Sequence, residues 1–223
     1  MKVFAINGSP MLDKGSTAMI LKPFLEGMRE AGAETELFYA SNLNIKPCPG
    51  CIYSCWRDKP GECLINDDMQ SIYPKLRSAD ILVLATPVYV PLPGEFQNFL
   101  NRIVPLMDPV LTTTPGGRTR ARLHENVKIK KVVLVSTSGW WETGNFGTVL
   151  RIARELTADI SVEFAGAILR PHSAYMQQKN EKTKKILENC KLAGYQLIKE
   201  GKMHKETLKV IGSPLVTRKK YLQ

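Results

Sequence analysis

Short apolar runs alternate along the chain with segments in which apolar residues recur at every third or fourth position. A short run bounded by glycine, proline or asparagine is typical of a buried strand, and the longer spacing is typical of an amphipathic helix. The pattern predicts strands over residues 2–6, 34–39, 80–86, 130–137 and 161–169. It predicts helices over about residues 16–32, 67–77, 94–104, 145–157 and 180–199, the second opened by a capping box at Asp67-Asp68-Met69-Gln70.

This order of elements predicts an α/β fold with a doubly wound, five-stranded parallel sheet covered by helices on both faces. The run 80–86 is apolar at both odd and even positions, as a central parallel strand requires. Residues 1–202 are expected to form one domain, with an irregular basic stretch before the fourth strand. Residues 203–223 are expected to form a basic C-terminal extension, either a loose tail or a contact with another subunit.

Composition narrows the class of protein. The 223 residues are 43% hydrophobic and 23% charged, which is typical of a globular chain. No apolar run approaches the roughly 20 residues of a membrane span, so none is expected. The N-terminus lacks the apolar region and cleavage site of a secretory signal, and we therefore expect a cytoplasmic protein with reduced thiols.

The net charge of +10 is unevenly distributed. Residues 1–111 carry ten Lys and Arg against twelve Asp and Glu, whereas residues 112–223 carry 21 against nine. A basic surface attracts acidic proteins or phosphates, for example the 2′-phosphate of NADPH at Arg118, Arg120 or Arg122, but a solvated basic face without a partner fits as well. Nucleic-acid binding is not expected, because no such motif is present.

Three predicted loops follow strands and therefore meet at the carboxyl edge of the sheet, where doubly wound folds bind ligands. The first, residues 7–17, offers hydroxyl groups, glycines and the start of a helix, which suit a phosphate. The second, residues 86–94, offers Tyr89 among prolines, and the third, residues 136–142, contains Trp140 and Trp141. Each loop taken alone also fits a plain structural connection.

Four cysteines lie within the sixteen residues 48–63, which we call the cysteine loop. Metals and iron–sulfur clusters require several thiolates around one point, and clustered cysteines in a reduced compartment favour ligands or redox groups over a disulfide framework. Cys190 stands alone in a predicted helix and is expected in the core.

The ordered set of motifs resembles a known family. Asn7-Gly8-Ser9-Pro10 with Gly15-Ser16-Thr17, Asn66-Asp67-Asp68-Met69, Thr86-Pro87-Val88-Tyr89 and Asn101-Arg102 are similar to motifs of the flavodoxin-like NAD(P)H-dependent FMN reductases. The cysteine loop resembles the branch that includes the iron–sulfur flavoproteins. The resemblance runs from about Met1 to Arg170 and implies a flavodoxin-like sheet of order 2-1-3-4-5.

The resemblance also implies which residues hold FMN. Ser9, Ser16 and Thr17 would bind the phosphate. The ribityl chain and the ring would lie along Pro87, Val88, Tyr89 and Val90, with Ser138, Gly139 and Trp140 beside the ring. The chain departs from the family at Met11, where relatives often have Arg, and at Pro91-Leu92-Pro93, where many have a Gly-Ser-type turn.

For the cysteine loop, the resemblance implies a [4Fe–4S] cluster on Cys48, Cys51, Cys55 and Cys63. The gaps hold two, three and seven residues, and the second gap is one residue longer than in the family pattern. Three alternatives stay open: a Cys₄ zinc site, a Cys48–Cys51 redox dithiol, and thiols without a cofactor.

The expected function is an FMN-dependent oxidoreductase that passes electrons from NAD(P)H or a low-potential carrier through FMN to an unidentified acceptor, by way of the cluster if present. No side chain is assigned as a catalytic acid or base, because the flavin carries the chemistry. An acidic ferredoxin-like partner and a homodimer or tetramer are expected. The alternatives are an FMN reductase without a cluster, a cofactor-free binding module, and a non-enzymatic FMN carrier, which the sequence pI of about 9.4 disfavours.

Overall fold

The computed structural model describes residues 1–51, 53–114 and 116–223. Its centre is a five-stranded sheet in which all neighbouring strands are parallel, in the order β2-β1-β3-β6-β7. The strands are Lys2–Asn7 (β1), Glu34–Tyr39 (β2), Ile81–Pro87 (β3), Lys131–Thr137 (β6) and Glu163–Arg170 (β7). Because β4 and β5 lie outside this sheet, its order is the predicted 2-1-3-4-5. The predicted doubly wound, flavodoxin-like α/β fold is confirmed.

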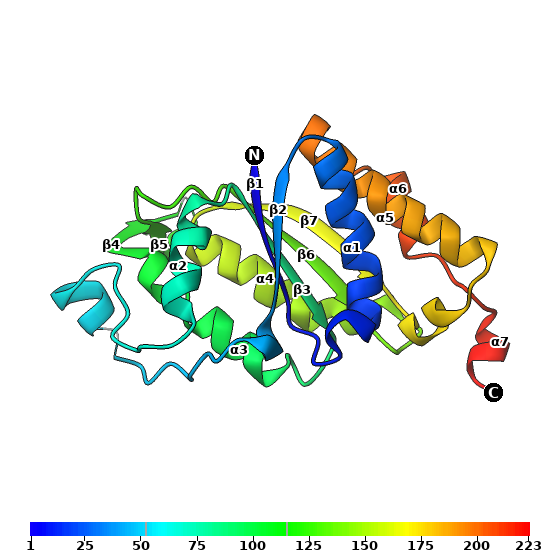
Figure 1. Cartoon of the computed structure of the whole chain (residues 1–223), viewed down its shortest axis with the longest axis horizontal. Coiled ribbons are helices and arrows are strands. Elements are labelled where there is room, and N and C mark those ends of the chain that lie inside the picture. Colours follow the sequence, from blue (N-terminus) through cyan, green and yellow to red (C-terminus); the bar gives the residue numbers. More distant parts are fainter. Residues whose placement is uncertain (52, 115) are drawn as a thin grey trace.

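Helices cover both faces of the sheet (Figure 1). One face is covered by α1 and α5, with α6 packed beside α5, and the other by α2, α3 and α4. The helices are Ser16–Glu30 (α1), Met69–Ser78 (α2), Gly94–Asn101 (α3), Gly147–Asp159 (α4), Glu181–Glu200 (α5), Lys205–Ile211 (α6) and Arg218–Tyr221 (α7). In the part of the chain that the structure describes, no helix is long and apolar enough to cross a membrane.

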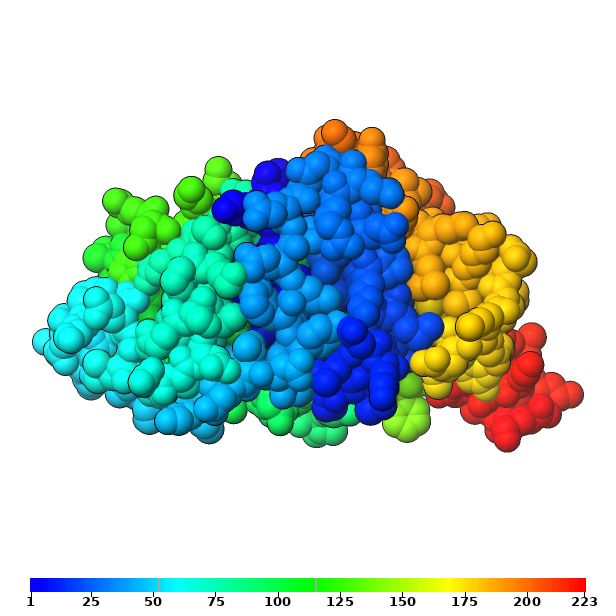
Figure 2. Space-filling model, in the orientation of Figure 1, coloured from blue at the N-terminus to red at the C-terminus, as the bar shows by residue number. Residues whose placement is uncertain are grey.

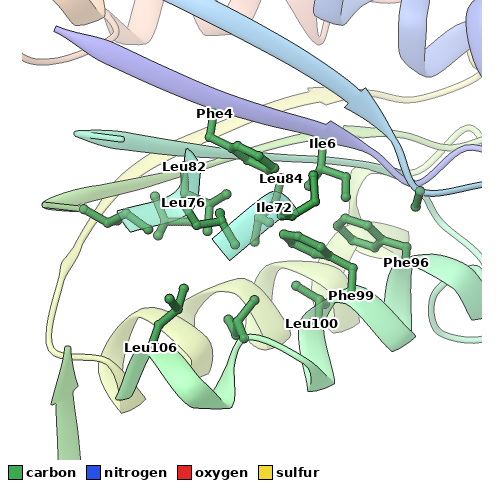
Figure 3. Packing of buried hydrophobic residues seen from close by; sticks show 14 of the residues in the cluster. Phe4, Ile6, Ile72, Leu76, Leu82, Leu84, Phe96, Phe99, Leu100 and Leu106 are labelled. Atoms are coloured by element: carbon green, nitrogen blue, oxygen red, sulfur yellow. The ribbon is translucent and has the colours of Figure 1, made fainter. Parts of the chain in front are cut away.

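The strands send alternate side chains into two separate cores. Val3 and Ala5 of β1 face the core under α1 and α5, whereas Phe4 and Ile6 face the core under α2 and α3. Figure 3 shows Phe4 beside Ile72 of α2 and above Phe99 of α3. Burying each such side chain contributes about 1.5–3 kcal/mol, so the period-two pattern of β1 holds helices on both faces of the sheet.

Helices α1 and α5 approach closely through two glycines. A Cβ atom placed on Gly27 would overlap the carbonyl oxygen of Lys191, and one placed on Gly194 would overlap the carbonyl oxygen of Phe24. The two backbones therefore touch where side chains would otherwise separate them. This contact sets the position of α5, the longest helix, over β1, β3 and β6.

The stretch predicted as irregular contains a β-hairpin. Met107–Thr113 (β4) and Thr119–Leu123 (β5) form a separate antiparallel ribbon. Arg120 ties the ribbon to α4 through ion pairs with Glu155 and Asp159. The prediction was wrong here because most of β4 is exposed, so its sequence carries neither the apolar run nor the alternation of a buried strand.

The segment after α5 packs on its own chain. Met203, Ile211 and Leu215 are buried in the same core as α1 and α5. The end of the chain, with α7, lies at the opposite end of the long axis from the cysteine loop, as Figure 2 shows. The division of the chain at residue 202 stays a prediction.

We predict that Gly194→Ala lowers the free energy of unfolding by about 1–3 kcal/mol, because the added methyl group forces α1 and α5 apart. Urea denaturation measures this change. The matched control is Gly147→Ala, at the start of α4, where a Cβ meets no atom within 4 Å and the backbone is already helical. The control should be neutral or slightly stabilising, and equal losses in both variants would contradict the close contact.

Candidate functional site

Three loops meet at the carboxyl edge of the sheet, as predicted. Asn7 ends β1 beside Ala85 of β3, and Pro87 ends β3 beside Thr137 of β6. The loops that follow these strands therefore start next to one another. The first loop also touches α3, because a Cβ on Gly8 would overlap the ring of Phe96.

The three loops surround an open hollow of about 560 Å³, which we call the edge hollow. Pro10 lines it from the first loop, Val88, Tyr89 and Val90 from the second, and Trp140 from the third. Tyr89 is 51% exposed and Trp140 is 63% exposed, so both rings are available to a ligand. The volume lies in the range of about 300–1,000 Å³ that is usual for small-molecule pockets. The structure thus brings four of the predicted ring-contacting residues together.

The predicted phosphate residues lie in the first loop and at the start of α1, and their hydroxyl groups make contacts within the protein. The buried hydroxyls of Thr17 and Thr137 hydrogen-bond at 2.8 Å, and Ser16 Oγ donates to the carbonyl of Ser173 at 3.2 Å. Ser9 Oγ accepts from the backbone N–H of Met11 at 3.3 Å. These side chains fix the loop. Since Gly15 offers α1 no side-chain cap, the backbone N–H groups at the helix start are the donors suited to an anion.

The other predicted contacts of the ring, Pro87, Ser138 and Gly139, do not line the edge hollow. Pro87 is the last residue of β3, and Ser138 is buried, with its backbone N–H donating to the carbonyl of Arg170 at 3.0 Å. The carbonyl of Gly139 accepts from Tyr221 Oη at 3.0 Å. These residues set the course of the second and third loops.

Trp141, beside Trp140, packs inward on the C-terminal segment. Its ring stacks on His172 at 4.7 Å between centroids and meets Tyr221 of α7 at 5.4 Å. Burial, and then the nearby guanidinium of Arg170, lower the pKa of His172 to about 4, so this ring is neutral at physiological pH. The third loop is therefore held by a cluster of aromatic rings that includes α7.

The four clustered cysteines line a second cavity, of about 460 Å³, which we call the cysteine cavity. Cys55 is buried, Cys51 and Cys63 are half-buried, and Cys48 is exposed. Apolar side chains from the end of α3 and beyond, including Leu100, Ile103 and Met107, line the rest. A π-helical turn, Ser54–Asp58, carries Cys55.

The cysteine cavity has the donor atoms of a soft-metal site. Burial, and then the neighbouring Cys51, raise the pKa of the Cys55 thiol, and Cys63 and Cys48 add to this. Neighbouring thiolates repel one another, so a cation bound between them would stabilise their charged form. In residues 1–51, 53–114 and 116–223, no three Cys, His, Asp or Glu side chains surround a point that one metal ion would occupy. Thiols are the ligand type that iron–sulfur clusters use, and all four clustered cysteines line this one cavity.

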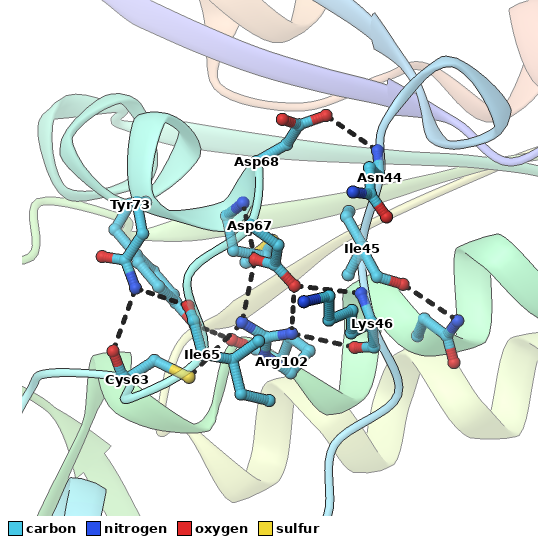
Figure 4. A network of polar contacts seen from close by, with 12 residues as sticks. Asn44, Ile45, Lys46, Cys63, Ile65, Asp67, Asp68, Tyr73 and Arg102 are labelled. Carbon is cyan, nitrogen blue, oxygen red and sulfur yellow. Dashed lines mark hydrogen bonds and ion pairs between the residues drawn. The ribbon is translucent and has the colours of Figure 1, made fainter.

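Arg102, which lines the cysteine cavity, belongs to a buried ion pair, and Figure 4 shows the polar network around it. Arg102, at the end of α3, donates to both carboxylate oxygens of Asp67 at 2.6 and 3.0 Å, and both side chains are at most 1% exposed. Arg102 also donates to the carbonyl of Lys46 at 2.8 Å and to Cys63 Sγ at 3.3 Å. One guanidinium therefore contacts the chain on both sides of the cysteine loop.

Asp67 is acidic for a buried carboxyl group. Burial alone would raise its pKa, but hydrogen bonds from Arg102 and from the backbone N–H groups of Lys46 and Met69 outweigh burial, and the pKa is lowered. The predicted capping box is wrong, because Gln70 donates its side-chain amide to the carbonyls of Cys63 and Ile65 instead. Asp67 and Gln70, at the start of α2, therefore both hold the cysteine loop in place.

Neither Arg102 nor Asp67 was predicted to belong to a functional site, although both stood in the motifs that carried the family resemblance. The usable signal was an arginine at the end of a helix whose other inward residues, Phe96, Phe99 and Leu100, are apolar. Such an arginine needs a buried anion, but periodicity does not show where that anion lies in the chain.

Helix α3 joins the two sites. Pro93, Gly94 and Glu95 line the edge hollow at its start, and Leu100, Asn101 and Arg102 line the cysteine cavity at its end. Eight helical residues span about 12 Å. The two sites are thus one short helix apart.

The sequence model of the NADPH-dependent FMN reductase family matches residues 1–152. The chain belongs to this family. That result confirms the family expected from the sequence and gives a reason for the position of the edge hollow, since the matched region supplies all three of its loops.

The similar curated proteins are named iron–sulfur flavoproteins. One from Methanosarcina thermophila is 38% identical over 106 residues, which cover 47% of this chain and 53% of that protein. One from Methanocaldococcus jannaschii is 36% identical over 129 residues, which cover 58% and 56%. The chain thus spans about half the length of the curated relatives that it matches.

Solved structures share the fold at low sequence identity. An NAD(P)H:quinone oxidoreductase from Methanothermobacter marburgensis aligns with a TM-score of 0.60 at 16% identity, covering 88% of this chain and 96% of that one. An FMN-dependent NADH-azoreductase from Bacillus anthracis, solved with FMN, aligns with a TM-score of 0.62 at 15% identity, covering 88% and 99%. These similarities agree with the flavodoxin-like sheet.

We predict that Asp67→Asn lowers the free energy of unfolding by about 3–5 kcal/mol at neutral pH, because it leaves the buried Arg102 charge without its partner. A lowered folded-state pKa stabilises the protein above the unfolded pKa of about 3.9 and loses this effect as pH falls through the folded value. The difference between Asp67→Asn and the wild type should therefore shrink below about pH 4.

Urea denaturation across this pH range measures both effects. Asp58→Asn is the matched control, since Asp58 is exposed on the cysteine loop, and its unfolding free energy should stay within about 0.5 kcal/mol of the wild type. A loss in Asp67→Asn that is equally large at neutral and acid pH would show that the ion pair is not its source.

Proposed function

We infer that this protein is an FMN-dependent oxidoreductase that takes electrons from NAD(P)H and carries a [4Fe–4S] cluster close to the flavin. The observation that supports this most directly is the placement of four cysteines around one cavity, a single short helix away from the edge hollow of an FMN reductase family member. A second redox group so close to a flavin serves electron transfer better than it serves stability.

The edge hollow suits FMN in three respects. The backbone N–H groups at the start of α1 would meet the phosphate, with Ser9, Ser16 and Thr17 fixing that loop. Pro87, Val88 and Val90 would lie along the ribityl chain. The exposed rings of Tyr89 and Trp140 would flank the isoalloxazine ring, with Ser138 and Gly139 supporting the third loop behind it.

Bound FMN would supply hydride acceptance and the release of electrons one or two at a time. The chain's own residues bind and orient it, and we name no general acid or base among them. Arg118 and Arg120 pair with Glu155, and Arg122 pairs with Asp108, so these cations already have partners on the protein surface. They are accordingly not assigned to the phosphate of NADPH.

Cys48, Cys51, Cys55 and Cys63 would hold the cluster. Thiolate ligands are what such clusters use, and the positive charge of the irons would offset the burial and the thiolate repulsion that raise the pKa of Cys55. The cluster would pass electrons singly, for which an acidic ferredoxin-like protein is the proposed partner. A Cys₄ zinc site and a redox dithiol are the outcomes that the metal assay below would distinguish.

A homodimer or tetramer completes the proposal. Tyr89, Val90 and Trp140 leave a large apolar surface exposed around the edge hollow, with Val90 entirely open to solvent. Apolar surface gathered beside a ligand site is typical of a surface that another subunit covers. Mass measured in solution by light scattering tests this part of the proposal.

We predict that protein purified without oxygen contains about four irons and four sulfides per chain, and that alanine at any of the four clustered cysteines removes most of both. Cys190→Ala is the control. Cys190 is fully buried in α5, where burial raises its pKa to about 12, so it is a neutral core thiol. Zinc in place of iron, or iron lost equally from the control, would overturn the cluster assignment.

We predict that Tyr89→Ala and Trp140→Ala each raise the Kd for FMN about five- to tenfold, because each removes about 1 kcal/mol of ring contact. Quenching of FMN fluorescence measures the Kd. Tyr195→Ala, which removes a similarly exposed ring from α5, should leave it unchanged. FMN reduction by NAD(P)H without oxygen, followed on the same samples, distinguishes a reductase from an electron carrier, which would bind FMN without reducing it.

A further inference from the structure

Arg102 stands out among the charged residues because its side chain is buried and one of its donors points at a sulfur. The side chain is 1% exposed, and Nη2 lies 3.3 Å from Cys63 Sγ. Nη2 also binds Asp67, and Nη1 binds Asp67 and the carbonyl of Lys46. The planar guanidinium is thus fixed on three sides, and its direction toward Cys63 does not depend on a flexible side chain.

The second observation is the chemistry of the acceptor. A neutral thiol is a weak hydrogen-bond acceptor, whereas a thiolate accepts a charge-assisted hydrogen bond. Asp67 spreads its one negative charge over Arg102 and the backbone N–H groups of Lys46 and Met69. The guanidinium therefore retains attraction for a further anion, and Cys63 Sγ is positioned to be that anion.

We propose that Arg102 is a positioning residue that binds the Cys63 thiolate and raises the reduction potential of the iron–sulfur cluster. This inference rests on the proposed function. Reduction adds one negative charge to the cluster and its ligands, and a fixed cation that hydrogen-bonds a ligand sulfur stabilises the reduced form more than the oxidised form. Burial strengthens this effect, because few water molecules screen the charge.

The arrangement also explains why one arginine contacts so many partners. Lys46 precedes the cysteine loop and Asp67 follows it, so Arg102 holds its two ends together as well as one ligand. If Arg102 had only a structural role, replacing it would change the stability of the protein but not the reduction potential of the cluster. An effect on the potential separates the two roles, because the potential compares two states of the same folded protein.

The test is an anaerobic redox titration of the cluster, monitored by electron paramagnetic resonance, in the wild type, Arg102→Met and Arg102→Lys. We expect Arg102→Met to shift the one-electron equilibrium about tenfold toward the oxidised cluster, which is about 59 mV. Arg102→Lys keeps a charge but loses the planar fork, and its shift should be smaller. Arg57→Met, which removes an exposed arginine of the same loop that lies over the Tyr53 ring, should leave the potential unchanged.

A second measurement does not need Arg102→Met, in case that variant does not fold. With ¹⁵N-labelled arginine, pulsed resonance of the reduced cluster should detect a coupled guanidinium nitrogen, and Arg102→Lys should lose it. An unchanged potential in a variant that keeps its iron and sulfide, or no ¹⁵N coupling in the wild type, overturns this inference and leaves the proposed function standing. A wild type without iron overturns both.

Discussion

The ion pair between Arg102 and Asp67 is the interaction on which the cysteine loop depends. Both charges are removed from water, which costs several kcal/mol for each ion unless the partners are well placed. Two short hydrogen bonds, with further bonds to the Lys46 carbonyl and from the Lys46 and Met69 N–H groups, meet that cost. Among the described residues between Lys46 and Asp67, few apolar side chains are buried, so the ends of this segment are held mainly by the polar network.

The edge hollow depends on a different principle. Its residues come from loops that each follow a parallel strand, and the registers of β1, β3 and β6 place those strand ends side by side. The sheet itself is stabilised by apolar burial on both faces. The protein therefore has one site positioned by the sheet and another positioned by a buried salt bridge, and α3 connects them.

The sequence predicted most of what local pattern determines. The apolar runs of β1, β3 and β6 and the spacing of α1 and α5 are properties of neighbouring residues, and the order of loops at the sheet edge follows from them. It did not predict the β4–β5 ribbon, in which most of β4 is exposed to solvent. It also did not predict the ion pair between Arg102 and Asp67, which lie 35 residues apart in the chain. Contacts between distant polar residues leave no periodic pattern in the sequence, so the network around Cys63 could be recognised only in the folded chain.

Helix α3 is fixed at both of its ends, and this has a consequence for how the protein tolerates change. Its start packs Phe96 against Gly8 of the first loop, and its end places Arg102 against Asp67. A residue inserted between them would rotate one end by about 100° relative to the other, so only one of the two contacts could form. The spacing of two redox centres in this fold would therefore depend on the length of α3 more than on the identity of its exposed residues.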